Sequence, residues 1–189
     1  MIVFVRLAPL TALLVTLSAL AGGCGGSTSP EEKWAGDVCT QVTDWQNQVT
    51  QSTDEISNQL HSPGAGTLNA IRADINLIVD ATSKLASNLK SLGAPDTPSG
   101  AQAKQQVDSF ATQLNQAAQQ ARQTAASVPP GASITDIVSK VASLGPAVQT
   151  LANNASTTLK SVQSSAQSLK DGFAKADSCK PFRSLTGSS

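Results

Sequence analysis

Apolar residues recur at steps of three and four along the chain after residue 30, and this spacing is typical of amphipathic α-helices. Breaks rich in proline and glycine divide the pattern, so we expect helices over residues 31–60, 67–92, 99–128 and 133–180. Four long helices joined by short loops predict an all-α fold, an antiparallel up-down-up-down four-helix bundle. We find no alternating run that would indicate β-strands.

The ends of these segments carry local signals. Pro30 stands where the first segment begins, at a position where a helix tolerates proline. Residues 63–66 (Pro-Gly-Ala-Gly) predict the turn that follows it. At the start of the last segment, Ser133 and Asp136 resemble a capping box. These signals fix the expected boundaries more closely than the apolar pattern alone.

The last segment contains an interruption. Gly145 and Pro146 predict either a kink or a short helix followed by a long one. We expect Pro181 to end the segment. The apolar steps do not form a strict heptad repeat, which favours nearly straight helices over a long supercoil.

The composition agrees with packed helices. The chain of 189 residues has no tyrosine and only 3% aromatic residues, so its core must consist mainly of leucine, valine, isoleucine and alanine. A β-sandwich would require more β-branched and aromatic alternation.

Cys24 follows an apolar stretch and a group of small residues. Arg6 is the only charged residue before it, residues 7–21 form an apolar core, and small residues fill positions 21–23. This arrangement resembles the lipobox of bacterial lipoproteins, with the usual leucine displaced by one position to Leu20. The resemblance implies that Cys24 receives a diacylglyceryl group and becomes the first residue after cleavage.

Two other interpretations of this segment are a membrane-spanning helix and an ordinary secretory signal. The apolar core spans 15 residues, fewer than the roughly 20 that a membrane-spanning helix needs. An ordinary secretory signal remains the alternative, although the cysteine directly after small residues favours the lipoprotein pattern.

The resemblance implies a domain organisation. Residues 1–23 would be the signal peptide, residues 24–30 a lipidated flexible tether, residues 31–180 the helical domain and residues 181–189 a C-terminal tail. The chain is thus similar to bacterial cell-envelope lipoproteins, and its richness in alanine, serine and threonine suggests an actinobacterial one. We expect it on the extracytoplasmic face of the cell membrane, which it contacts through its lipid anchor.

Two further cysteines, Cys39 and Cys179, suggest a disulfide in an exported protein. Cys39 lies near the start of the first segment and Cys179 at the end of the last, and these positions fall at the same end of an antiparallel bundle. We therefore predict a bridge between them. This end would lie beside the tether and the membrane, with residues 63–66 and 129–131 at the outer end.

The charge pattern excludes some partners. Removal of residues 1–23 leaves 12 Lys and Arg against 13 Asp and Glu, without a basic cluster, so we expect no nucleic-acid partner. His61 is the sole histidine and there is no Cys-x-x-Cys spacing, so we expect no metal and no cofactor. His61 is best explained as an exposed residue at a helix end.

Two pairs of side chains could belong to a site. Trp34 and Trp45 could line a ligand pocket, but both fall on the apolar stripe, which favours core packing. Asp37 and Asp44, with Gln41 between them, share a helix face and could bind a cation, although a solvated polar face is the simpler interpretation.

Catalytic residues are not expected. Asp74 and Asp80 do not share a face well enough for acid–base work, and His61 gives little support to a Ser-His-Asp arrangement. Our leading hypothesis is a non-enzymatic interaction or structural module that binds an envelope protein. The alternative is a small-molecule-binding bundle, which a large closed apolar cavity between the helices would favour. The oligomeric state is left open.

Overall fold

The computed structural model describes residues 28–64, 66–127, 129 and 132–183, and all regular secondary structure in them is helical. The elements are four long helices followed by three short ones. They are α1 (Pro30–His61), α2 (Thr67–Ser91), α3 (Gly100–Ala126), α4 (Ile134–Ser164), α5 (Gln167–Lys175), the 3-10 turn η1 (Asp177–Cys179) and α6 (Lys180–Arg183). The predicted all-α class is confirmed.

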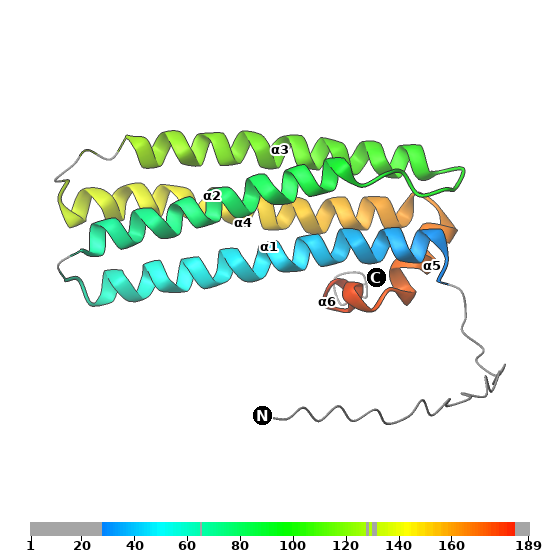
Figure 1. The fold of residues 1–189 in the computed structure, drawn as a ribbon, viewed down its shortest axis with the longest axis horizontal. Coiled ribbons are helices and arrows are strands. Elements are labelled where there is room, and N and C mark those ends of the chain that lie inside the picture. The colour runs from blue at the N-terminus through cyan, green and yellow to red at the C-terminus, as the bar shows by residue number, and fades with distance from the viewer. Residues whose placement is uncertain (1–27, 65, 128, 130–131, 184–189) are drawn as a thin grey trace, which may run out of the picture.

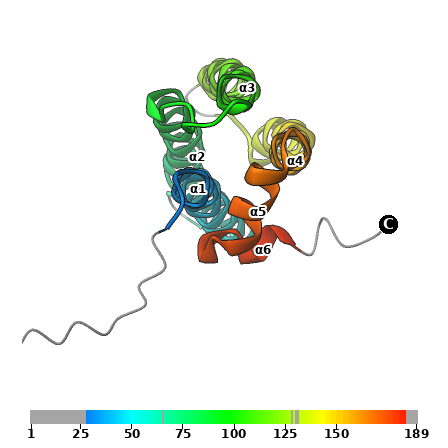
Figure 2. The same cartoon turned by 90° about the vertical axis from the view of Figure 1, so that its right-hand side faces the viewer.

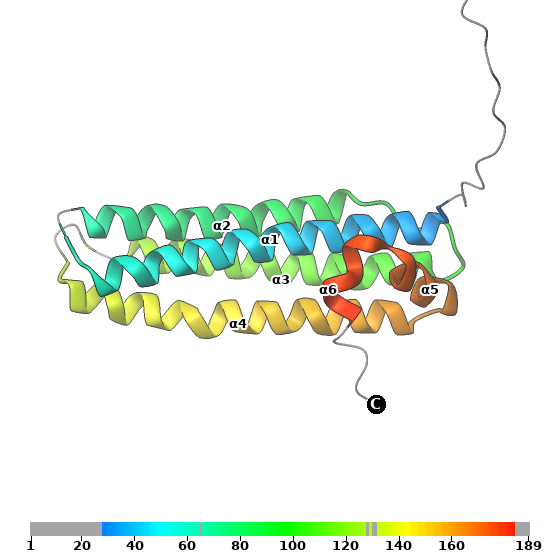
Figure 3. The ribbon, with the colours of Figure 1, turned by 90° about the horizontal axis from the view of Figure 1, so that it is seen from below.

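The four long helices lie side by side along the long axis of the molecule (Figure 1). α1 packs along α2, α2 along α3, and α3 along α4, whereas α1 and α4 touch over only a short stretch. The end-on view shows α5 between α1 and α4 (Figure 2). Seen from below, α6 crosses the same seam (Figure 3). The seam between α1 and α4 is thus covered at one end only.

Capping residues explain where the helices begin. Ser29 precedes α1, and its Oγ accepts a hydrogen bond of 3.1 Å from Glu32 N. At α4 the predicted capping box is confirmed, because Ser133 Oγ accepts from Asp136 N while Ser133 N donates to the Asp136 carboxylate. Gly66 precedes α2 with φ of 96°, a conformation that favours glycine.

The last helix is not split at Gly145 and Pro146, because α4 is one helix through both residues. Proline removes one helical hydrogen bond. Here Pro146 and Ala142, whose carbonyl loses that donor, are both exposed, so water can satisfy the carbonyl. The chain instead leaves the helix at Ala166, which is extended at φ −159° and ψ 149°.

The predicted end of the last helix at Pro181 is wrong. Pro181 occupies the second position of α6, where the missing N–H has no helical partner to lose. Phe182, next to it, is only 4% exposed. The packed body therefore extends into the region predicted as a tail.

The buried apolar side chains form two clusters. The larger cluster lies toward the start of α1 and includes Trp34, Trp45 and Leu114. The smaller lies toward the turn between α1 and α2 and is built around Ile56, Ile71, Ile75, Val79 and Ala118. Ile78, which is partly buried, packs against both clusters and joins them.

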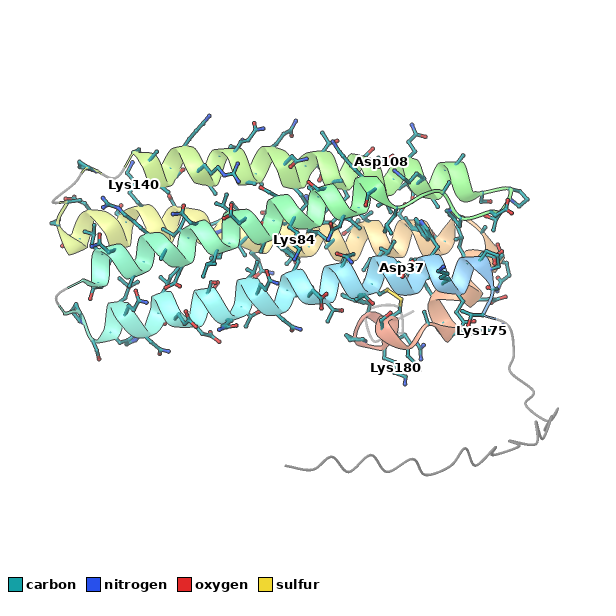
Figure 4. All side chains as sticks on the ribbon, in the orientation of Figure 1. Asp37, Lys84, Asp108, Lys140, Lys175 and Lys180 are labelled. Atoms are coloured by element: carbon teal, nitrogen blue, oxygen red, sulfur yellow. A yellow bond between two sulfur atoms is a disulfide. The ribbon has the colours of Figure 1, made fainter. Side chains whose placement is uncertain are left out.

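The residues after α4 form a C-terminal clamp, defined here as residues 167–183, which packs on α1. Cys39 Sγ and Cys179 Sγ are 2.04 Å apart, so the predicted disulfide is present, and Figure 4 shows its yellow bond beside Asp37. Ser178 Oγ donates to Gly36 O at 2.8 Å. Phe173 meets Trp34 edge to face with ring centroids 6.3 Å apart. Covalent, polar and aromatic contacts together hold the clamp on the first helix.

Candidate functional site

A cavity of about 370 Å³ lies among the four long helices, and we call it the central cavity. It lies where the two core clusters meet. Trp45, Val49 and Leu151 of the larger cluster line one part of it, and members of the smaller cluster line the rest. These members are Ile56, Ile75, Val79 and Ala118.

Short side chains on α3 and α4 create this space. α3 contributes Ala117, Ala118 and Ala121, and α4 contributes Gly145 and Ala147. A Cβ built on Gly145 would meet nothing within 4 Å. Among the described residues, these positions of α3 and α4 therefore contribute little side-chain volume at the cavity.

The polar groups in the wall are satisfied within the protein. Trp45 Nε1 donates to Thr82 Oγ1 at 3.1 Å, and Thr82 Oγ1 donates to Ile78 O at 2.7 Å. Trp45 can therefore present its ring to the cavity while its N–H stays hydrogen-bonded. To a ligand, this part of the wall is apolar.

The edge of the cavity is polar but uncharged. Its exposed lining residues include Thr53, Gln120, Ser143 and Gln149, so the cavity is open to the surface and not closed. Among the residues described, the lining contains no Asp, Glu, Lys, Arg or His. The site can therefore hold an apolar molecule, but it offers neither a general base nor a counter-ion.

Trp34 and Trp45 have different surroundings. Trp34, 6% exposed, packs in the core as predicted, and its Nε1 donates to Gly93 O at 2.7 Å. Trp45, 4% exposed, is also a core residue, yet it lines the central cavity. The core interpretation is thus confirmed for Trp34, and Trp45 has both roles.

The structure does not join the predicted polar candidates into a site. Asp37 and Asp44 are exposed on α1, and Gln41 Oε1 accepts from Asn88 Nδ2 on α2. Within the described ranges, no three His, Cys, Asp or Glu side chains are grouped so that they could hold a metal ion. His61 is exposed at the end of α1, as predicted, with Nδ1 2.7 Å from Ser57 O.

Asp74 and Asp80 lie in different environments. Asp80 is exposed and forms an ion pair of 3.1 Å with Arg122 on α3. Asp74 is only 5% exposed, and its Oδ2 accepts a hydrogen bond of 3.0 Å from Gln59 Nε2. Burial raises the pKa of Asp74 above its usual 3.8; the Gln59 hydrogen bond lowers it, and the nearby Glu55 raises it further. Sequence analysis missed this buried carboxylate.

We expect Asp74→Asn to raise the melting temperature at pH 7 by a few degrees and to leave it unchanged near pH 3. A folded-state pKa above the unfolded value means that the folded chain binds the proton more tightly. The contribution of Asp74 to stability is therefore greatest below about pH 3.8 and is lost as the pH rises through the folded-state pKa. Thermal unfolding of the full chain followed by circular dichroism measures this difference. Asp44→Asn, on the exposed face of α1, is the control and should change nothing; a destabilised Asp74→Asn chain at pH 7 would contradict the expectation.

The predicted lipidation site, Cys24, lies outside the described residues. Among the helices that the structure describes, none combines the length and the apolarity that crossing a membrane requires. No protein-family model, curated protein or solved structure matches this chain.

Proposed function

We propose that the protein is an extracytoplasmic lipoprotein, anchored through Cys24, that binds an apolar small molecule. In this proposal residues 24–30 tether an up-down-up-down four-helix bundle to the membrane, and the ligand occupies the central cavity. The protein acts by binding and not by catalysis. The observation that carries the proposal is the apolar cavity of about 370 Å³ among the four helices.

The volume and the lining support a ligand site. Small-molecule pockets in proteins usually have about 300–1,000 Å³ and mostly apolar walls. Each square ångström of apolar surface that a ligand removes from water contributes about 25 cal/mol. Because the helices already stand apart at this point, binding requires no separation of a packed core.

The outer surface gives less support to a protein-docking module. Docking faces concentrate large apolar and aromatic side chains in the centre of a patch. Among the described residues, the exposed large hydrophobic ones are Leu77 and Val138, which stand on separate helices, α2 and α4. We therefore place the small-molecule site ahead of a docking face, on its volume and its apolar wall, although the cavity is open at its edge and not closed.

The test compares two alanine-to-phenylalanine substitutions on α3. Ala121 lines the cavity and is half-buried, whereas Ala126 is exposed at the end of the same helix. The probe is N-phenyl-1-naphthylamine, an uncharged fluorescent molecule. The protein is the full chain carrying Cys24→Ser, so that no acyl group of its own can enter the cavity.

We expect saturable binding to this chain, about a tenfold or larger loss of affinity in Ala121→Phe, and little change in Ala126→Phe. The phenyl ring occupies space that the probe needs, and a tenfold loss corresponds to about 1.4 kcal/mol. Energy transfer from the two tryptophans of α1, one of which, Trp45, lines the cavity, reports that the probe lies close to this helix. The absence of saturable binding, or equal affinity in all three chains, would refute the proposal.

The anchor is tested separately by metabolic labelling with a radioactive fatty acid. We expect the wild-type chain to be labelled and the Cys24→Ser chain to be unlabelled. Retention of label in Cys24→Ser would show that Cys24 is not the acylated residue.

A further inference from the structure

The hydroxyl groups around the central cavity all direct their hydrogens away from it. Thr53 Oγ1 donates to Val49 O at 2.7 Å, Thr124 Oγ1 to Gln120 O at 3.0 Å, and Ser143 Oγ to Lys140 O at 2.6 Å. Each acceptor is a backbone carbonyl of the same helix, three or four residues earlier.

A hydroxyl that uses its one hydrogen in this way keeps only acceptor capacity. The edge of the cavity therefore presents a set of oxygen lone pairs on three helices, α1, α3 and α4. Lone pairs attract a ligand group that donates a hydrogen bond. These hydroxyls offer no hydrogen to a carboxylate or phosphate, whose oxygens are themselves acceptors.

The charges near the cavity lead to the same conclusion. No cationic side chain is among its described lining residues, and Lys140, one turn before Ser143, is exposed and does not line it. An anionic head placed here would lose water without gaining a counter-ion, which is costly. Gln120 and Gln149 supply amides that can pair with a neutral polar group.

From this arrangement we infer that the ligand is a neutral lipid alcohol, an apolar chain or ring system whose uncharged hydroxyl head donates to the oxygens at the edge of the central cavity. The apolar part lies against the wall formed by Trp45, Val49 and Leu151. This inference rests on the proposed function, because it specifies the ligand of the same site.

Three probes with the same twelve-carbon chain but different polar groups test which head group the cavity prefers. They are 1-dodecanol, which donates a hydrogen bond, dodecyl methyl ether, which only accepts, and dodecanoate, which is anionic at pH 8. Each is titrated as a competitor of N-phenyl-1-naphthylamine on the full chain carrying Cys24→Ser. We expect dodecanol to compete at about tenfold lower concentration than dodecanoate and at several-fold lower concentration than the ether.

Removal of the acceptors should abolish this preference without closing the cavity. The combined substitution Thr53→Val, Thr124→Val and Ser143→Ala replaces hydroxyls by groups of similar size. We expect dodecanol to lose its advantage over the ether, while the ether binds at least as tightly as before. The control is Thr112→Val on α3, whose Oγ1 also bonds its own helix but does not line the central cavity, and which should leave the preference intact.

The outcomes distinguish the two proposals. Dodecanoate binding as tightly as dodecanol, or a preference for dodecanol that survives the triple substitution, would overturn the assignment of a neutral alcohol. The assignment is also overturned if the fluorescent probe binds but none of the three competitors displaces it. Failure of the fluorescent probe itself to bind would instead refute the proposed function.

Discussion

Replacing Cys39 and Cys179 together with alanine is expected to lower the free energy of unfolding by about 4 kcal/mol. The two residues are 140 apart in sequence, so the disulfide restricts the unfolded chain over most of the helical body. In the chain-entropy account a loop of this length corresponds to roughly 5 kcal/mol, and measured losses are often somewhat smaller. Both cysteines are fully buried, so their sulfurs also lose packing contacts.

Urea denaturation of the full chain, followed by circular dichroism, measures this loss. Wild-type chain reduced with dithiothreitol in denaturant should give a similar midpoint to that of the double alanine variant, because the same constraint is removed. The full chain with Cys24→Ser is the matched control, and it should keep the wild-type midpoint. A loss of less than about 1 kcal/mol would show that the bridge contributes little to stability.

Unfolding of the chain that lacks the disulfide should begin in the C-terminal clamp. Apart from the disulfide, the clamp is held on α1 by side-chain contacts such as Ser178 Oγ to Gly36 O and Phe173 against Trp34. Without the covalent link, local opening of residues 167–183 requires less free energy than global unfolding. Hydrogen exchange should therefore speed up in α5 and α6 before it does so in α2 and α3.

The first three helices were predicted closely because their boundaries have local causes. The expected segment 31–60 became Pro30–His61, and 67–92 became Thr67–Ser91. Proline, glycine and capping serines act through the backbone of their immediate neighbours, so their effect is readable in sequence. The disulfide was equally predictable, because it follows from which helix ends meet.

The end of α4 could not be read in the same way. Pro146 is a strong local signal against a helix, but the exposed helix tolerates it. The actual departure at Ala166 has no glycine or proline. It brings Leu169 and Phe173, which are 0% and 2% exposed, into the larger core cluster, so tertiary packing determines the turn.

The candidate site was only partly visible in the sequence. From the sequence, a cavity between the helices was only the alternative hypothesis. Whether Ala121 and Gly145 face a gap or a tight helix contact depends on the relative positions of four helices, which periodicity does not fix. The direction of the Thr124 hydroxyl likewise depends on its rotamer and not on its identity.

Gly172→Ala is expected to lower the free energy of unfolding by about 2 kcal/mol, although alanine is the better helix former. Gly172 lies in α5, where the clamp approaches the start of α1. An added Cβ would lie 2.8 Å from the carbonyl carbon of Glu31 and 2.9 Å from its oxygen. These are backbone atoms, so no side chain can rotate away to make room.

Neither partner in this contact can easily shift. Glu31 is in the first turn of α1, which Ser29 caps through its hydrogen bond with Glu32 N. The clamp, which carries Gly172, is fixed to the same helix by the disulfide at Cys179. Relief of the clash therefore requires separation of α5 from α1, and overpacking of this kind typically costs about 1–3 kcal/mol.

Gly36→Ala is the matched control, because Gly36 is also a glycine inside a helix at the boundary between α1 and the clamp. Its added Cβ would lie 3.6 Å from Ser178 Oγ, an ordinary van der Waals contact. We expect this variant to gain about 0.5–1 kcal/mol from helix propensity alone. Urea midpoints of the two full-length variants should therefore move in opposite directions. A Gly172→Ala chain that gained stability as Gly36→Ala does would show that α5 is not seated tightly on α1.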